Sequence, residues 1–257
     1  MKKNNSGRET IRLENGFLVT PDGIIRSEVV LRDGRIDLSA PKAAGEHVIN
    51  IDGKYVVPGF VDIHFHGYNL FDFTLGQFCP ETNDFDSSEP AYGAGFEMLS
   101  KTLARFGVTG FYVSTLAAAS QTLKNCCGNL TKYLKKKQNV SAGARMFGVM
   151  LEGSFINPDM AAAQNVKYLF EPSRQVFDSI EDTGSIKLAN VVPDFGQSSV
   201  KLIEYLCDKG IVVGAGHTNA TCEQFSEAVK AGLKYCIHFT NGPTGRSEEH
   251  TSELQSR

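Results

Sequence analysis

Residues 56–67 read VVPGFVDIHFHG, a run of strand-forming residues that ends in two histidines separated by one position. On a strand, side chains at positions i and i+2 point to the same face, so His64 and His66 are predicted to lie side by side. Imidazole nitrogens suit zinc and its neighbours among the metals, and a catalytic site of this kind needs about three protein ligands and an open position for water. The stretch therefore predicts a metal site whose other ligands come from elsewhere in the chain.

The composition is that of an ordinary globular protein, with 257 residues, 41% hydrophobic and 21% charged. A net charge of -3 gives no reason to expect nucleic acid or an anionic membrane as a partner. The N-terminus lacks the apolar run of a signal peptide, and no stretch has the length of a membrane span. The six cysteines show no CxxC spacing, which argues against a zinc module or a disulfide scaffold. We expect a cytoplasmic protein with reduced thiols.

Residues 9–55 form a segment of short β-rich pieces separated by turn signals. Asp-Gly pairs stand in the turns at 21–23, 33–34 and 52–53, and such pairs between strand-like runs are typical of hairpins. The segment is therefore predicted to be a small antiparallel β unit. It is too short to be stable by itself, so we expect it to pack on the larger part of the chain.

From residue 56 onwards, strand-like runs alternate with helix-like segments. Strands are expected over 56–65, 107–115, 144–153, 185–195, 211–218 and 235–242, and helices over 93–106, 120–137, 198–209 and 221–231. The strands are nearly continuous apolar runs, as in a parallel sheet covered by helices. Six such units predict an α/β fold over 56–245, an incomplete (β/α)8 TIM-type barrel, because the closed barrel needs eight. Residues 246–257 break the alternation and are expected to be a non-native tail.

Polar residues sit toward the C-terminal ends of the predicted strands, where a barrel of this type has its active site. These residues are His64, His66, Glu152, His217, His238 and Asn241. Taken singly, a histidine at a strand end is usually a hydrogen-bonded structural residue, and a lone glutamate is uninformative. Because the histidines and the glutamate belong to four strands of one series, together they favour a metal centre.

The motifs around these residues resemble the amidohydrolase superfamily and, within it, the N-acetylglucosamine-6-phosphate deacetylases. The resemblance rests on HFH after PGFVD, on LEGSFINP at 151–158, on GHTNAT at 216–221 and on HFTNGP at 238–243. It extends from the first hairpins to about Gly245. It implies a metal-bearing barrel beside a small β-sandwich made from both chain ends, with residues 9–55 as the N-terminal part of that sandwich.

The resemblance also implies which residues hold the metal. Glu152, His217 and His238 are the implied ligands of the main divalent ion, and His64 and His66 are able to hold a second one. Histidine and glutamate ligands suit zinc, iron, manganese and cobalt, and we expect zinc.

The implied reaction is hydrolysis of the acetamide of N-acetylglucosamine 6-phosphate by metal-activated water, which gives glucosamine 6-phosphate and acetate. The substrate is expected to contact Gln164, Asn241 and the backbone of Gly242. Two positions depart from the family pattern: Gln164 replaces a histidine that contacts substrate, and Ser154 replaces a proline. Glutamine donates a hydrogen bond but carries no charge, so another N-acetyl amino sugar phosphate, such as N-acetylgalactosamine 6-phosphate, stays open as the substrate.

The family's general acid/base is an Asp after the eighth strand, and this sequence ends before that strand. We therefore expect a C-terminally truncated deacetylase, without a catalytic residue for proton transfer and with negligible turnover of its own. The full-length protein is expected to be a homodimer. An incomplete barrel exposes strand edges and apolar faces, so the chain is also expected to be prone to aggregation.

Two other functions remain open at this stage. Hydrolases of cyclic amides in the same superfamily carry a carboxylated lysine at a strand end, but Glu152 fills that position here and no lysine ends a predicted strand. A non-catalytic sugar-phosphate-binding relative would keep the metal ligands and lose the acid/base. An Asp after a later strand in the parent gene would favour the enzyme over such a binding protein.

Overall fold

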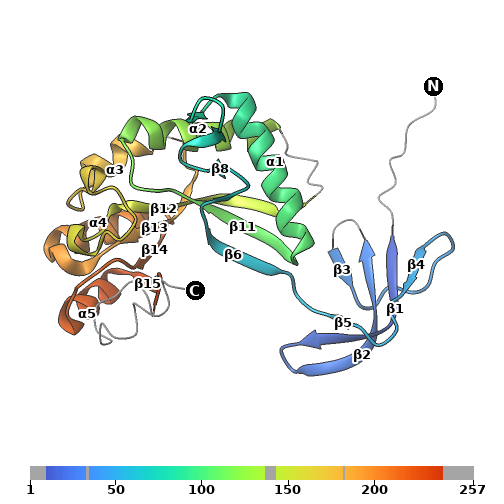
Figure 1. Ribbon diagram of the computed structural model, residues 1–257. Coiled ribbons are helices and arrows are strands. Elements are labelled where there is room, and N and C mark those ends of the chain that lie inside the picture. The colour runs from blue at the N-terminus through green and yellow to red at the C-terminus, as the bar shows by residue number, and fades with distance from the viewer. Residues whose placement is uncertain (1–9, 33–34, 137–142, 182, 240–257) are drawn as a thin grey trace, which may run out of the picture. The chain divides into compact units, whose positions relative to one another are not determined.

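The computed structural model describes residues 10–32, 35–136, 143–181 and 183–239 (Figure 1). The chain divides into two compact units, the first ending at Gly59 and the second beginning at Phe60. The boundary lies four residues later than the expected one at 55/56. The reason is that strand β5 (Tyr55–Val56) pairs with β1 of the first unit.

The first unit contains one five-stranded sheet in its described residues. Besides β5, the strands are β1 (Ile11–Thr20), β2 (Gly23–Arg32), β3 (Arg35–Asp37) and β4 (His47–Asn50), in the order β3-β2-β1-β4, with β5 pairing β1. The antiparallel pairs β1–β2 and β2–β3 confirm the hairpins predicted at 21–23 and 33–34. The second sheet of the predicted sandwich is not among the described residues.

The prediction of a wholly antiparallel unit is wrong for β4 and β5, which both run parallel to β1. The turn at Asp52 and Gly53 therefore does not close a hairpin. The turn lies beside an irregularity of β1 between Leu13 and Gly16. There Gly53 N donates a hydrogen bond to Asn15 O at 2.8 Å. Gly53 has a φ of 71°, so the Asp-Gly pair was read correctly as a turn but not as a connection between antiparallel strands.

The second unit contains the six-stranded parallel sheet that the sequence predicts. Its strands are β6 (Phe60–Phe65), β11 (Val108–Ser114), β12 (Arg145–Phe155), β13 (Ile186–Val191), β14 (Val212–Ala215) and β15 (Leu233–Cys236). Their order in space is β15-β14-β13-β12-β11-β6, so each strand pairs with its neighbours in the sequence. This is the arrangement of six consecutive strands of a (β/α)8 barrel.

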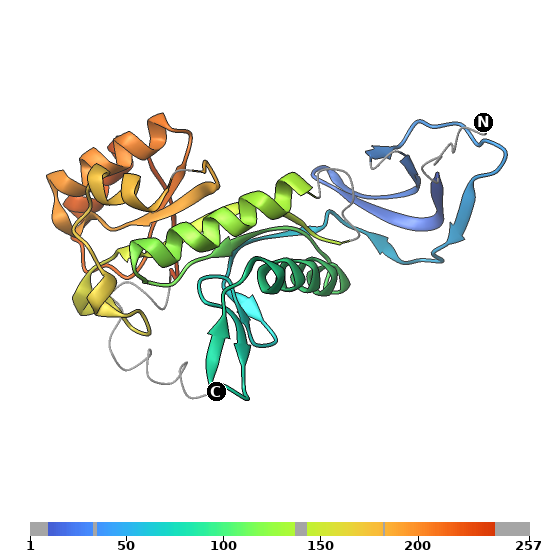
Figure 2. The same cartoon turned by 90° about the horizontal axis from the view of Figure 1, so that it is seen from above.

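The α-helices among the described residues lie along one face of this sheet (Figures 1 and 2). They are α1 (Glu89–Arg105), α2 (Ser120–Lys136), α3 (Arg174–Ile180), α4 (Gln197–Asp208) and α5 (Cys222–Ala231). Helix α1 begins four residues before its predicted start because the Ser88 hydroxyl accepts from Ala91 N and a proline occupies the first turn. Helix α3, of seven residues, was not predicted. None of the helices in the described ranges is long and apolar enough to cross a membrane.

A small antiparallel sheet occupies the segment between β6 and α1, for which the sequence predicts neither a strand nor a helix. It consists of β7 (Gly67–Tyr68), β8 (Phe71–Asp72), β9 (Gly76–Cys79) and β10 (Asp84–Asp86) in sequential order. The buried ring of Phe71 packs edge-on against Tyr92 and Phe96 of α1, with centroids 5.7 Å away in both cases. This aromatic contact joins the small sheet to the core of the unit.

The core of the second unit lies on both faces of the parallel sheet. In β12, Val149 and Leu151 belong to the large cluster on the helix side, and Met150 between them belongs to a small cluster with Leu188 and Ile237. The alternation follows from the period of two along a strand. Because both faces of β12 are buried, its carboxyl end is held in a fixed position.

Candidate metal centre

Four histidines and one glutamate meet at the carboxyl ends of the parallel strands. His64 is in β6, and His66 is the first residue after the end of that strand. Glu152 is in β12, and His217 and His238 stand two residues after the ends of β14 and β15. The structure thus brings together all five residues that the sequence predicts as metal ligands.

The four imidazoles surround the carboxylate of Glu152. Its Oε1 atom lies 3.4 Å from His64 Nε2, 3.5 Å from His217 Nε2 and 3.0 Å from His238 Nε2. Its Oε2 atom lies 3.2 Å from His66 Nε2. The ligand atoms form two overlapping groups that share Glu152, one with His64 and His66 and the other with His217 and His238.

Glu152 carries its negative charge in a nearly closed environment, with 1% of its side chain exposed. Burial is the largest influence on its pKa and acts to raise it, but hydrogen bonds with the four histidine rings together outweigh burial and hold the pKa far below its usual range. The carboxylate is therefore ionised at neutral pH. A buried anion surrounded by imidazoles is an environment that attracts a divalent cation.

The imidazole of His217 lies between the Glu152 carboxylate and a backbone carbonyl. Its Nδ1 lies 2.8 Å from the carbonyl oxygen of Met160, which only accepts, so Nδ1 carries the hydrogen. In the neutral ring the lone pair of Nε2 is then directed at the centre, as in metal-binding histidines whose other nitrogen is hydrogen-bonded. Burial lowers the pKa of His217, but its hydrogen bonds with Glu152 and the Met160 carbonyl outweigh burial and raise it.

The separations between the donor atoms fit a metal ion. Nitrogen ligands about 2.0–2.1 Å from a tetrahedral zinc ion lie about 3.3 Å from one another. His64 Nε2 and His66 Nε2 are 3.0 Å apart, and the nitrogen–oxygen separations around Glu152 range from 3.0 to 3.5 Å. The donor set of imidazole and carboxylate also suits zinc and its neighbours. The described residues therefore fit the metal that the sequence predicts.

The loops that carry His217 are fixed by two residues that the sequence analysis did not single out. The side-chain amide of Asn190 exchanges two hydrogen bonds with the backbone of Gly216, at 3.1 and 3.2 Å. Asp194 accepts from Asn157 Nδ2 at 2.6 Å and from the Thr218 hydroxyl, which joins the loops after β12 and β14. Asp194 stands at the carboxyl end of the expected strand 185–195, and that position was a signal available in the sequence. Asn190 lies in the middle of the expected strand, where no such signal marked it.

These contacts hold His217 in an unusual backbone conformation. Its φ is 60°, and that of His238 is 51°, in the left-handed region that residues other than glycine rarely adopt. The Asn157 N–H donates to the His217 carbonyl at 3.1 Å, next to the Asn190 pair with Gly216. Strained backbone conformations held by several contacts are typical of functional sites.

The three residues expected to contact substrate fall into two groups. Gln164 is 9% exposed and hydrogen-bonds to Glu152, so it lies beside the metal centre. Asn241 and Gly242 lie outside the described residues. The predicted tail at 246–257 also lies outside them.

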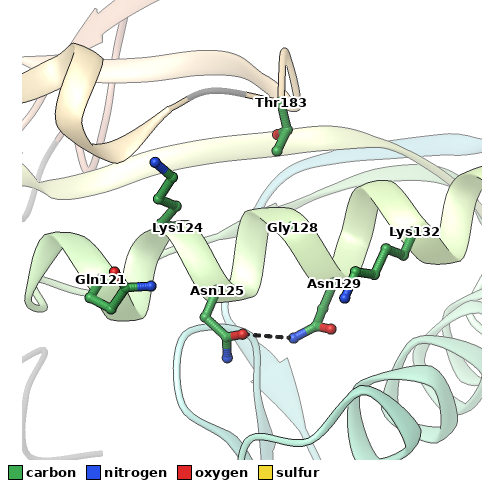
Figure 3. A pocket seen from close by; sticks show the side chains of 7 residues that line it. All are labelled: Gln121, Lys124, Asn125, Gly128, Asn129, Lys132 and Thr183. Atoms are coloured by element: carbon green, nitrogen blue, oxygen red, sulfur yellow. Dashed lines mark hydrogen bonds between the residues drawn. The ribbon is translucent and has the colours of Figure 1, made fainter.

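A polar pocket of about 280 Å³ lies elsewhere, along helix α2 (Figure 3). Lys124, Asn125, Asn129 and Lys132 of that helix line it together with Thr183. Asn129 Nδ2 donates to Asn125 Oδ1 at 3.4 Å. The pocket contains none of the predicted site residues, so the candidate site is the centre around Glu152.

The chain is similar to curated N-acetylglucosamine-6-phosphate deacetylases. The chain is 26% identical over 240 residues to the N-acetylglucosamine-6-phosphate deacetylase of Bacillus subtilis, a match that covers 91% of this chain and 57% of that protein. It is 24% identical over 243 residues to the deacetylase of Caenorhabditis elegans, covering 91% and 55%. The resemblance predicted from the motifs is thus confirmed, and the chain spans just over half the length of these curated relatives. No family model matches the chain.

Solved structures agree with the fold. The deacetylase of Thermotoga maritima superimposes with a TM-score of 0.69 at 25% identity, covering 94% of this chain and 59% of that one. A variant deacetylase of Mycobacterium smegmatis in complex with N-acetyl-D-glucosamine-6-phosphate gives a TM-score of 0.70 at 20% identity, covering 91% and 56%. The six-stranded sheet therefore matches part of the barrel of these deacetylase structures.

Proposed function

We propose that the chain is the metal-bearing part of an enzyme that hydrolyses N-acetylglucosamine 6-phosphate to glucosamine 6-phosphate and acetate. The observation that carries the proposal is the convergence of four imidazoles on the buried carboxylate of Glu152. The similarity to deacetylases of this substrate over nine-tenths of the chain supports it. The comparisons give no support to the galactosamine derivative or to a non-catalytic relative.

Each ligand has a role in this proposal. Glu152, His217 and His238 hold the main ion, and His64 and His66 hold a second one. When bound, a zinc ion supplies Lewis acidity that activates water and polarises the amide carbonyl. The Met160 carbonyl keeps the proton of His217 on Nδ1, away from the ion. Asn241 and Gly242 are proposed to contact the sugar phosphate.

The remaining features of the whole protein are proposals of the same kind. Zinc is proposed over iron, manganese and cobalt, and a homodimer is proposed for the full-length protein. A cytoplasmic location is proposed because all six cysteines are free thiols rather than disulfides.

The test begins with the parent gene, sequenced past the codon for Gly245. The protein it encodes is expressed, loaded with zinc, and assayed for acetate release from N-acetylglucosamine 6-phosphate. We expect turnover that is lost in Glu152→Ala and His217→Ala and kept in His47→Ala, which changes a histidine of the first unit. A zinc-loaded, folded product that releases no acetate would contradict the proposal, and the galactosamine derivative would be the next substrate to assay.

A further inference from the structure

The side chain of Gln164 spans two fixed groups. Its Oε1 accepts from the Ala117 N–H at 2.7 Å, and its Nε2 donates to Glu152 Oε2 at 2.8 Å. The residue is 9% exposed, so these contacts are shielded from water. Because a backbone N–H can only donate, the oxygen of the amide must face Ala117 and the nitrogen must face Glu152. The orientation of the amide is thus determined by its partners.

The same loop also fixes the backbone of Glu152. The Thr115 hydroxyl accepts from Glu152 N and donates to Glu152 O, both at 2.9 Å. Thr115 and Ala117 both follow β11, so one loop controls the main chain of Glu152 directly and its carboxylate through Gln164. A hydrogen-bonded carboxylate keeps its oxygens in one direction, which is what a metal ligand needs.

We propose that Gln164 is a positioning residue that orients the Glu152 carboxylate for metal binding, rather than a substrate contact. The proposal deepens the proposed function, because it rests on Glu152 being a metal ligand. It replaces the expectation from the sequence that Gln164 contacts the sugar. One lone pair of Oε1 and one hydrogen of Nε2 are already used within the protein, in a side chain that is buried.

Gly153 provides the space that this arrangement needs. A Cβ atom at this position would lie 2.4 Å from Ala117 N and 2.8 Å from Gln164 Oε1. Any larger residue next to Glu152 would therefore displace the amide or the loop that holds it. This close packing of Gly153, Ala117 and Gln164 is what a fixed orientation of the Glu152 carboxylate requires.

The test measures zinc affinity by competition with a chromophoric chelator, with the melting temperature of the metal-free chain recorded in parallel. Gln164→Met keeps the length of the side chain but removes both hydrogen bonds. We expect its Kd for zinc to rise about 10–100-fold, as for other groups that orient metal ligands. Gln164→His offers one ring nitrogen to Ala117 and the other to Glu152, and we expect a Kd within about threefold of the unaltered chain.

Asn129→Leu is the matched control, because Asn129 is a buried amide on α2 with a hydrogen bond of its own. It should lower the melting temperature without changing the zinc Kd. A Gln164→Met chain that binds zinc as tightly as the unaltered chain would overturn the proposal, and so would a Gln164→His chain that binds as weakly as Gln164→Met. If the unaltered chain binds no zinc, the metal centre of the proposed function fails instead.

A measurement on the unaltered chain covers the case in which Gln164→Met does not fold. The side-chain NH₂ resonances of ¹⁵N-labelled glutamine are followed while zinc is added. The Gln164 signal should exchange slowly with solvent and shift on zinc binding, and the signal of the exposed Gln121 should do neither. A Gln164 signal that exchanges rapidly, or that zinc leaves unchanged, would overturn the proposal.

Discussion

Replacing Gly153 by alanine tests the packing beside Glu152 most directly. Gly153 has a φ of 93°, and an alanine in a left-handed conformation costs about 1–2 kcal/mol. Its Cβ would lie 2.4 Å from the backbone nitrogen of Ala117, an overlap that requires a shift costing about 1–3 kcal/mol. Together the two effects predict a loss of about 2–5 kcal/mol.

The loss is measured as a change in melting temperature of the second unit. At about 2–4 °C per kcal/mol for a unit of this size, Gly153→Ala should melt at least about 4 °C lower than the unaltered chain. Gly128→Ala in α2 is the matched control, because a Cβ there meets nothing within 4 Å. It should stabilise the helix by up to about 1 kcal/mol.

The two alanine variants are therefore expected to shift stability in opposite directions. A Gly153→Ala chain that melts at the same temperature as the unaltered chain would refute the reasoning. It would mean that the loop after β11 moves freely, and the support proposed for Glu152 would lose its basis.

Three further predictions concern stability. Burial raises the pKa of Asp72, so the native state keeps the proton of this carboxyl up to a higher pH than the unfolded state does. The free energy of unfolding should therefore fall as the pH rises from the pKa of unfolded Asp72 to that of native Asp72. Asp72→Asn should raise the melting temperature at pH 7 but not at a pH below both pKa values. Thr221→Ala removes the capping box of α5 and should cost about 1 kcal/mol in thermal unfolding, without changing the zinc Kd. Zinc at about 100 times its Kd should stabilise the chain by about 2.7 kcal/mol, and a chelator should reverse the gain in melting temperature; no shift with zinc would contradict the metal centre.

The sequence predicted those parts of the structure that have a clear hydrophobic pattern or a short sequence motif. The six parallel strands follow from apolar runs, and the positions of His64 and His66 follow from the alternation along a strand. His217 and His238 were placed at strand ends, where the structure has them. In each case the position of the side chain follows from the local backbone conformation.

The parts that the sequence did not predict depend on contacts distant in the chain. The small sheet β7–β10 lacks a clear alternation, and its stability comes from Phe71 packing on α1. The parallel pairing of β4 with β1 is decided by tertiary packing, since the Asp-Gly turn at 52–53 joins β4 to β5, and these two strands pair with β1 rather than with each other. The contacts of Gln164 with Glu152 and Ala117 span 12 and 47 positions, which no local pattern reveals.

The sequential order of the six strands has a consequence for the time course of folding. Because each strand pairs with its neighbour in the chain, the sheet can grow one strand at a time while the chain is being synthesised. The metal centre cannot form in this stepwise manner, because His64 belongs to the first strand and His238 follows the last, 174 positions later (64 to 238). We expect zinc capture to report the arrival of the last strand, so stopped-flow refolding with a zinc-sensitive dye should show capture after most secondary structure has formed.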